Sequence, residues 1–313
     1  MRILITGCKG QLARGFQQAL PGAGHDVSAP PEDVLDITDA ARVITAVGEF
    51  SPDIVINCAA YNNVDKAEEE FEMAYAVNAL GPKYLAAACR DTAALLVHYS
   101  TDYVFDGRKE GFYTEDDLPS PINRYGESKM AGDGFIQESG ARYLIMRTSW
   151  VYGDGSQNFL FKLMQWAGGQ KVLKVVADQI SVPTYTSDII SATMEACEKG
   201  LNGLYNLVNG GYATRYEVAR YFLDKAGSKV IVLPVNTDVF PSPARRPYFS
   251  VLSGRKLSAA LGHELPEWRD AIDRYVRSSG LMEASKWKRY LLRERPVLSG
   301  FISAAGCSAG DMR

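Results

Sequence analysis

The first thirteen residues of the chain decide its fold class. They read MRILITGCKGQLA, an apolar run at residues 2–6 followed by a glycine turn and an amphipathic stretch that continues to about residue 20. This order is typical of a buried strand that turns directly into a helix. Gly7 permits the tight turn, Gly10 lets the backbone approach a pyrophosphate at the helix N-terminus, and Ala13 lets the helix pack on the strand. The segment predicts a nucleotide-binding unit, and an ordinary glycine turn is the alternative.

Short apolar runs alternate with amphipathic stretches through the rest of the chain. Strands alternating with helices predict βαβ units and a parallel sheet. We therefore expect an α/β fold, a Rossmann-type doubly wound parallel sheet with a smaller C-terminal substrate-binding domain. Strands are expected over residues 53–57, 94–100, 142–147 and 204–208, and helices over 65–78, 82–90, 125–138, 158–167 and 187–200 and from about 266.

The pattern of expected strands, helices and turns changes after Trp150, and we place a domain boundary there. Residues 1–150 are expected to form the dinucleotide-binding domain, completed by a later strand near 203–209. Residues 151–285 are expected to form mainly the substrate-binding domain, with an irregular loop where four prolines fall within 234–247. The tail 286–313 is basic and then rich in Gly, Ser and Ala, and we expect part of it to be disordered.

Composition excludes several classes of protein. The 313 residues are 46% hydrophobic, which is ample for a core, and 34 Lys+Arg against 37 Asp+Glu give a formal net charge of −3. Such a chain has no global field to attract nucleic acid. It also lacks the roughly 18 apolar residues in a row that span a bilayer, and its apolar start is too short for a signal peptide. We expect a cytoplasmic protein with neither a nucleic-acid nor a membrane partner.

Cysteine and histidine give no sign of a metal site. The five cysteines, at 8, 58, 89, 197 and 307, are odd in number and widely spaced, without a C-x-x-C pair. This argues against a disulfide framework or a zinc site. The three histidines are scattered, and His98 lies inside a predicted strand, where a buried imidazole with satisfied hydrogen bonds is expected.

Two motifs carry candidate chemistry. Tyr125 and Lys129 are four residues apart in a predicted helix, so both side chains can face one site. We expect the nearby ammonium to favour the phenolate and lower the pKa of the tyrosine, so that it can exchange a proton with a forming alkoxide. Thr101 follows a buried strand, where its hydroxyl can stabilise charge on a substrate carbonyl. The alternative for Tyr125 and Lys129 is a pair on the surface of a helix without catalytic function. The alternative for Thr101 is a hydroxyl that only caps the strand end.

The second strand, predicted to end near residue 29, gives no clear cofactor signal. A carboxylate at this point favours NAD and an arginine favours NADP. Here Pro30-Pro31 are followed by Glu32-Asp33, with no arginine, and Asp36-Ile37 come at the usual place for adenine contacts. We expect both NADPH and NADH to serve, with a preference for NADPH.

Together these features resemble the extended short-chain dehydrogenase/reductases, and within them the dTDP-4-dehydrorhamnose reductases. The most specific matches are Tyr99-Ser100-Thr101-Asp102-Tyr103-Val104-Phe105 and Arg147-Thr148-Ser149-Trp150-Val151-Tyr152. Further matches are Asn57-Cys58-Ala59-Ala60, 64–68, 178–179 with 183–184, and 244–247. Related dehydratases usually carry an Asp-Glu pair after the threonine, whereas Asp102-Tyr103 stand here, which favours a reductase.

The resemblance implies a reduction of the 4-keto group of dTDP-4-dehydro-L-rhamnose and assigns a role to each matching residue. Thr101, Tyr125 and Lys129 would be catalytic, and Asp102, Tyr103 and Trp150 would hold the sugar with Thr101. The cofactor would contact Gly7, Gly10, Gln11, Leu12, Asp36, Ile37, Ala60, Tyr61, Asn62 and Tyr99, together with Tyr125 and Lys129.

The resemblance also leaves alternatives open. Some members bind Mg²⁺ between two subunits through an early glutamate, but residues 13–16 here read ARGF, so bound magnesium is not expected and the chain is a monomer or a homodimer. The alternative functions are another nucleotide-sugar ketoreductase, epimerase or dehydratase, or a non-catalytic nucleotide-binding subunit resembling the methionine adenosyltransferase β subunit.

Overall fold

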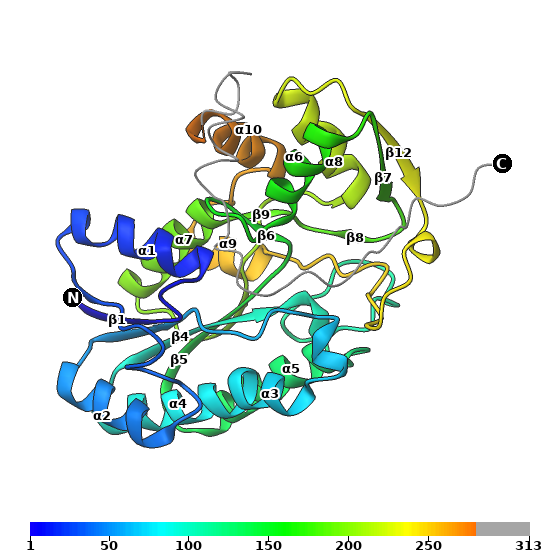
Figure 1. The fold of residues 1–313 in the computed structure, drawn as a ribbon. Helices are drawn as coiled ribbons and strands as arrows, with labels where there is room; N and C mark the ends of the chain where they lie inside the picture. Colours follow the sequence, from blue (N-terminus) through cyan, green and yellow to red (C-terminus); the bar gives the residue numbers. More distant parts are fainter. Residues whose placement is uncertain (280–313) are drawn as a thin grey trace.

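The computed structural model describes residues 1–279, and the predicted tail 286–313 lies outside this range. Its centre is a six-stranded parallel sheet in the order β10-β5-β4-β3-β1-β2 (Figure 1). The strands are β1 (Arg2–Thr6), β2 (Asp26–Ser28), β3 (Ile54–Asn57), β4 (Leu95–Thr101), β5 (Arg142–Thr148) and β10 (Gly203–Asn206). The chain reverses direction across the sheet between β1 and β3, the point at which doubly wound folds bind ligands.

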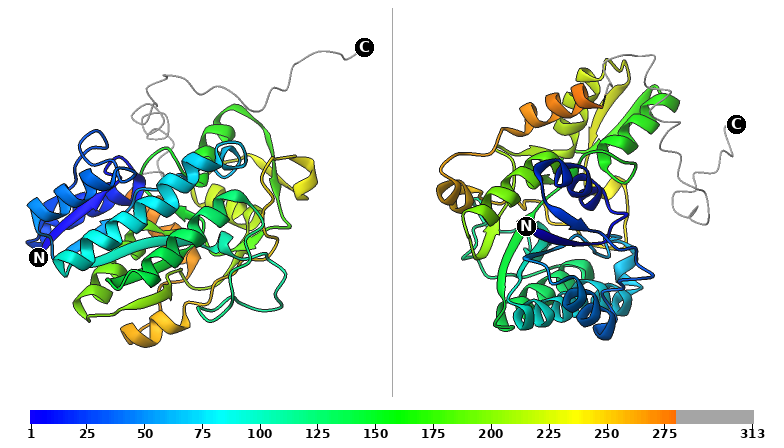
Figure 2. Two further views of the ribbon diagram at one scale, coloured as in Figure 1. Left: turned by 90° about the horizontal axis from the view of Figure 1, so that it is seen from below. Right: turned by 90° about the vertical axis from the view of Figure 1, so that its left-hand side faces the viewer.

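Helices cover both faces of this sheet (Figures 1 and 2). Consecutive strand residues point to opposite faces, so Ile3 and Ile5 pack in one core cluster and Leu4 in another. One face packs against α1 (Gln11–Ala19), α7 (Thr186–Glu198) and α9 (Arg255–Leu261). The other packs against α2 (Ala40–Phe50), α4 (Gly81–Thr92) and α5 (Arg124–Glu138). Burial of both faces confirms the expected doubly wound α/β fold.

The acidic segment predicted as one helix over 65–78 is broken. It contains a 3₁₀ turn (Lys66–Glu68), the short helix α3 (Phe71–Tyr75) and a π-helical turn (Ala76–Leu80) that leads into α4. The π turn places Asn78 in the protein interior, where its amide hydrogen-bonds to the backbone of Tyr61 and the hydroxyl of Ser128. π-Helical turns are rare in proteins, and those that occur are often found at functional sites.

A separate hydrophobic cluster lies beyond the sheet, at the top of Figure 1. It is built by α6 (Phe159–Gly169), α8 (Arg215–Lys225) and α10 (Trp268–Ser278), around Tyr152 and Tyr185. Small sheets border it: β6 (Val151–Tyr152) with β9 (Thr184–Tyr185), β7 (Val172–Val176) with β12 (Ile231–Val235), and β8 (Ile180–Ser181) with β11 (Ala213–Thr214).

The loop predicted over 234–247 is therefore only partly irregular. Its first residues belong to β12, which pairs in parallel with β7 and includes Pro234. A two-stranded sheet consists only of edge strands, where proline is tolerated. A 3₁₀ turn (Thr237–Val239) follows. Within residues 1–279, none of the helices has the length and apolar character needed to cross a membrane.

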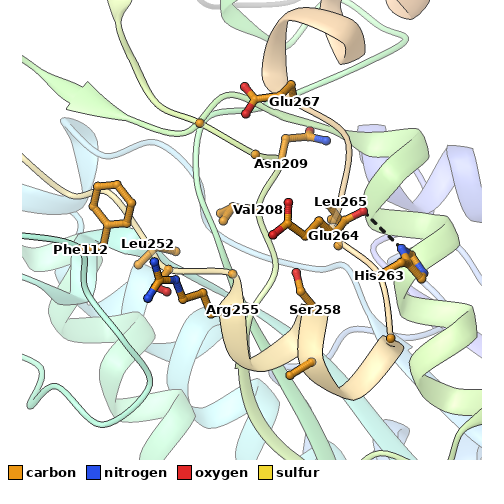
Figure 3. Close-up of a pocket in the computed structure, with 16 residues that line it drawn as sticks. Phe112, Val208, Asn209, Leu252, Arg255, Ser258, His263, Glu264, Leu265 and Glu267 are labelled. Atoms are coloured by element: carbon orange, nitrogen blue, oxygen red, sulfur yellow. Dashed lines mark hydrogen bonds between the residues drawn. The ribbon is translucent and has the colours of Figure 1, made fainter.

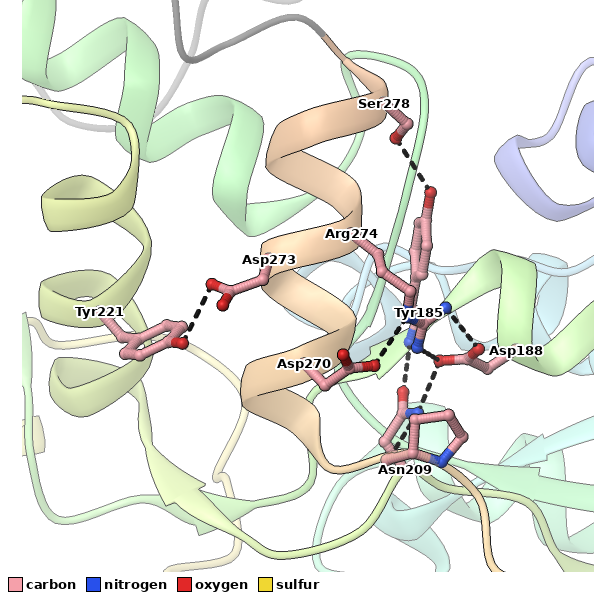
Figure 4. Close-up of polar contacts among 9 residues, drawn as sticks. Tyr185, Asp188, Asn209, Tyr221, Asp270, Asp273, Arg274 and Ser278 are labelled. Carbon is pink, nitrogen blue, oxygen red and sulfur yellow. Dashed lines mark hydrogen bonds and ion pairs between the residues drawn. The ribbon is translucent and has the colours of Figure 1, made fainter.

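A buried charged contact joins helix α10 to α7 (Figure 4). The guanidinium of Arg274 donates two hydrogen bonds of 2.8 Å to the carboxylate of Asp188 on α7, and a third of 2.7 Å to Asp270. Asp188 is buried and also accepts a hydrogen bond from Asn209, 2.7 Å away. The contact therefore connects α10, α7 and the loop after β10.

Candidate functional site

A cavity of about 330 Å³ opens at the carboxyl ends of the central strands. The turn after β1 forms one side of the cavity. This turn requires glycine at position 7, because Gly7 has φ +67° and a Cβ there would lie 2.6 Å from the backbone nitrogen of Ala59. Gly10 precedes α1, and no side chain caps that helix N-terminus. The first backbone N–H groups of α1 are therefore available to an anionic ligand, as a pyrophosphate requires.

The cavity collects most of the residues predicted from the sequence. Open α/β sheets bind ligands outside the carboxyl ends of their strands, which is called the strand-end rule below. It explains this grouping, because the carboxyl ends of β3, β4 and β5 meet at one edge of the sheet. Its lining includes eleven predicted residues: Gly10, Gln11, Leu12, Ala60, Asn62, Tyr99, Thr101, Asp102, Tyr125, Lys129 and Trp150.

Five predicted residues are not among the lining residues of this cavity. Gly7 forms the turn beneath it. The carboxylate of Asp36 accepts hydrogen bonds from Thr38, and Ile37 is buried beside Gly81. The hydroxyl of Tyr61 donates to Glu70 on the surface. Tyr103 is buried, and its ring forms a T-shaped pair with that of Tyr125 at a centroid distance of 6.0 Å.

Tyr125 and Lys129 both face the cavity from α5, but they do not interact as predicted. The Lys129 ammonium donates to the carbonyl oxygen of Tyr99 at 2.6 Å and lies 3.2 Å from Nε2 of His98. Burial raises the pKa of Tyr125, and the Thr101 hydroxyl offsets only part of this effect. The expectation that Lys129 lowers the pKa of Tyr125 is therefore wrong for this structure, and the phenol is protonated at neutral pH.

Asp102 lines the cavity but its carboxylate is turned toward the C-terminal part of the chain. It accepts hydrogen bonds from the hydroxyls of Ser181 at 3.0 Å and Ser250 at 2.5 Å. Burial raises the pKa of this carboxyl from 3.8 to about 6, against the lowering effect of those hydroxyls. Asp102 thus connects the end of β4 to segments far away in the sequence.

Trp150 forms the wall between this cavity and a smaller one of about 180 Å³. Its backbone has φ +41°, an uncommon conformation for a large side chain. The guanidinium of Arg215 lies 4.2 Å from the centroid of its ring. Strain of this kind persists only where the surrounding structure enforces it, and it is concentrated at functional sites.

Several polar groups around the cavity have no role predicted from the sequence. Asn57 and Gln157 line it, and His98 and Asp133 lie just beneath it. Asn57 ends β3, so the strand-end rule that selected Thr101 also applies to it. Asp133 lies one turn beyond Lys129, but that spacing alone does not show that both are buried.

A larger cavity of about 670 Å³ lies elsewhere, between the loop after β10 and α9 (Figure 3). Phe112, Arg255, His263 and Glu264 are among its lining residues, and none of the predicted site residues is. The His263 ring faces the backbone carbonyl of Glu264 and pairs with Glu195. Among residues 1–279, no group of three or more His, Cys, Asp or Glu could hold a metal ion.

Comparisons with known proteins agree with this geometry. Residues 1–280 match the family model described as RmlD substrate binding domain. The chain is 40% identical over 278 residues to a dTDP-4-dehydrorhamnose reductase of Mycolicibacterium smegmatis, covering 87% of this chain and 84% of that protein. It is 37% identical over 276 residues to the spore coat polysaccharide biosynthesis protein SpsK of Bacillus subtilis, covering 88% and 97%.

Solved structures give the same result. The crystal structure of dTDP-4-dehydrorhamnose reductase from Bacillus anthracis in complex with NADP superposes with a TM-score of 0.86 at 38% identity, covering 88% of this chain and 99% of that one. The likeness therefore extends over the sheet, the cavity and the C-terminal cluster alike. This chain belongs to the RmlD substrate binding domain family, the family of the dTDP-4-dehydrorhamnose reductases.

Proposed function

We propose that this chain is an NAD(P)H-dependent oxidoreductase that reduces the 4-keto group of dTDP-4-dehydro-L-rhamnose to give dTDP-L-rhamnose. One observation carries the proposal: Thr101, Tyr125 and Lys129 line the same cavity as the uncapped N-terminus of α1. The names of the relatives and the NADP in the Bacillus anthracis structure support the choice of substrate and cofactor.

The residues fit a dinucleotide. The free N–H groups at the start of α1 suit its pyrophosphate, and the absence of a Cβ at Gly7 keeps the turn close to Ala59. Lys129 and Tyr99 line the same cavity and would contact its ribose and nicotinamide end. When bound, the reduced nicotinamide supplies the hydride.

The protein's own groups account for the proton and the developing charge. The protonated phenol of Tyr125 donates the proton to the oxygen that becomes the hydroxyl group. The Thr101 hydroxyl donates a hydrogen bond to the same oxygen as its negative charge develops. Trp150 offers a flat apolar surface for the face and methyl group of a 6-deoxysugar.

The test is a panel of 4-keto dTDP-, UDP- and GDP-sugars with NADPH and with NADH, followed by loss of the reduced-cofactor absorbance. The dTDP substrate should react and its product should gain two hydrogens by mass spectrometry. We expect both cofactors to work, with less than about a hundredfold discrimination, or about 2.7 kcal/mol. Turnover confined to UDP- or GDP-sugars, isomerisation or dehydration of the sugar, or cofactor binding without turnover would each contradict the proposal.

A further inference from the structure

His98 lies directly beneath the cavity and connects two of its polar groups. It sits in β4, fully buried, and does not line the cavity itself. Its Nδ1 is 3.0 Å from the side-chain nitrogen of Asn57 on β3, and its Nε2 is 3.2 Å from Nζ of Lys129 on α5. The proposed catalytic lysine therefore ends a hydrogen-bonded chain that runs back into the sheet.

The position of the imidazole proton follows from the partners of Asn57. The amide oxygen of Asn57 accepts a hydrogen bond of 2.6 Å from the Thr6 hydroxyl and one of 3.2 Å from the backbone N–H of Ala59. Because a backbone N–H can only donate, the amide NH₂ must face His98. Nδ1 of His98 is then the acceptor, and the neutral ring carries its proton on Nε2.

A buried carboxylate on the other side of the ring agrees with this tautomer. Oδ1 of Asp133 lies 3.9 Å from Nε2 of His98 and has no hydrogen-bond partner among residues 1–279. Its second oxygen accepts from Ser100 at 2.8 Å and faces Nε of Arg147 at 3.5 Å. A carboxylate oxygen at this distance attracts an N–H on Nε2, whereas it would repel a lone pair there.

The charges around the ring come from two elements. Helix α5 supplies Lys129 and Asp133, and β5 supplies Arg147, while β1 and β3 contribute only the uncharged Thr6 and Asn57. Burial and the lysine charge lower the pKa of His98 well below 6.5. The imidazole is therefore neutral throughout the physiological range.

We propose that His98 is a positioning residue that presents its Nε2–H to Lys129 and thereby favours the neutral amine of that lysine over its ammonium form. An N–H facing an ammonium at 3.2 Å sets two donors against each other, whereas a neutral amine accepts the hydrogen bond. Burial acts in the same direction, because it lowers the pKa of Lys129 to about 8. The inference rests on the proposed function only for the role of Lys129.

The tautomer can be measured directly, because the chain has only three histidines. Imidazole nitrogens labelled with ¹⁵N give distinct chemical shifts for Nδ1–H, Nε2–H and imidazolium. From about pH 5 to about pH 9, one ring should stay neutral with its proton on Nε2, and its signals should disappear in His98→Asn. A proton on Nδ1, or titration of this ring, overturns the proposal whether or not the chain is a reductase.

Two substitutions separate the two ends of the ring. The amide of His98→Asn reaches the position of Nδ1 and keeps the Asn57 contact, whereas that of His98→Gln reaches the position of Nε2 and can still donate to Lys129. The alkaline fall of kcat/KM is expected to follow deprotonation of Lys129. His98→Asn should move this fall upward by about one pH unit, because the Lys129 ammonium no longer faces a hydrogen-bond donor. His98→Gln should leave this fall near that of the wild type.

The control is His263→Asn, which changes an exposed histidine paired with Glu195 and should leave the profile unchanged. An unmoved profile in His98→Asn, or an equal shift in both His98 variants, overturns the proposal. If no substrate is turned over, the function proposed above fails, and the ¹⁵N measurement still decides the tautomer.

Discussion

At the scale of single residues, burial controls the chemistry of the cavity. Tyr125 and Lys129 come from one face of α5, where Lys129 is buried and Tyr125 is partly buried at the cavity wall, and desolvation drives each toward its neutral form. A protonated phenol suits a reaction in which the enzyme must give a proton to a carbonyl oxygen. Sequence spacing brings the two groups together, but it contains no information about their solvation.

Tyr125→Phe tests the proton donor, because it removes a single hydroxyl and leaves the ring in place. The variant should fold and bind NADPH as the wild type does, while kcat falls about 10²- to 10⁴-fold, the usual contribution of general acid catalysis. Steady-state kinetics, cofactor titration and thermal melting provide the measurements. Wild-type turnover in a folded Tyr125→Phe protein would remove Tyr125 from the proposed mechanism.

Trp150→Ala tests the substrate contact. Trp150 is only partly buried, and its ring packs against Arg215 at the wall of the cavity. We expect kcat/KM for the 4-keto sugar to fall while NADPH affinity and Tm change little. Trp166→Ala, at an exposed tryptophan on α6, is the matched control and should leave all three unchanged.

The opposite result would assign Trp150 to the core. In that case Trp150→Ala should lower the free energy of unfolding by about 3–5 kcal/mol, as truncation of a buried tryptophan does. Cofactor affinity would then fall together with Tm, and the claim of a sugar contact would be lost.

At the scale of elements, helix α10 depends on a charged contact that no local sequence pattern shows. Arg274→Met leaves the buried carboxylate of Asp188 with Asn209 but without its cation (Figure 4). We expect a loss of about 3 kcal/mol in the free energy of unfolding, measured by urea denaturation, because a charge then stays buried without a countercharge.

Arg90→Met is the control for that measurement. Arg90 forms an ion pair with Asp91 on the surface, where the side chains are 52% and 64% exposed, respectively. A surface pair of this kind contributes about 0.5 kcal/mol or less. Adding Asp188→Asn to Arg274→Met should recover part of the loss. Equal effects of Arg274→Met and Arg90→Met would show that the α10 contact adds nothing to stability.

At the scale of the whole molecule, Asp102 joins the sheet to the C-terminal part of the chain and makes stability depend on pH. Its carboxyl has a pKa of about 6 in the folded protein against 3.8 ordinarily. Between these values the folded chain holds more protons than the unfolded chain, so this group's contribution to stability falls as pH rises. The full change across the window is about 3 kcal/mol.

Asp102→Asn removes this titration. The difference in unfolding free energy between wild type and variant should therefore fall by about 2.4 kcal/mol from about pH 4 to about pH 7, measured by urea denaturation at each pH. Asp116→Asn, at an exposed position, is the control and should give no such slope. If the difference in unfolding free energy stays constant or rises with pH, the pKa of Asp102 is not raised in the folded protein.

The sequence by itself determined the α/β class, the alternation of strands and helices, the positions of Thr101 and Trp150 at strand ends, and the pair Tyr125 and Lys129 on one helix. These follow from local rules: apolar periodicity, a glycine turn, and the meeting of parallel strands at their carboxyl ends. It also determined the family, through the runs 99–105 and 147–152.

Only the tertiary structure decided the protonation of these residues and the contacts that join the two parts of the chain. The phenol of Tyr125 stays protonated because several elements enclose it, and Asn57 fixes the proton of His98 because β1 and β3 bring Thr6 and Ala59 to its amide oxygen. Asp102 meets Ser250 across 148 residues. Desolvation and long-range hydrogen bonds depend on which groups surround a side chain, and spacing along the sequence does not contain that information.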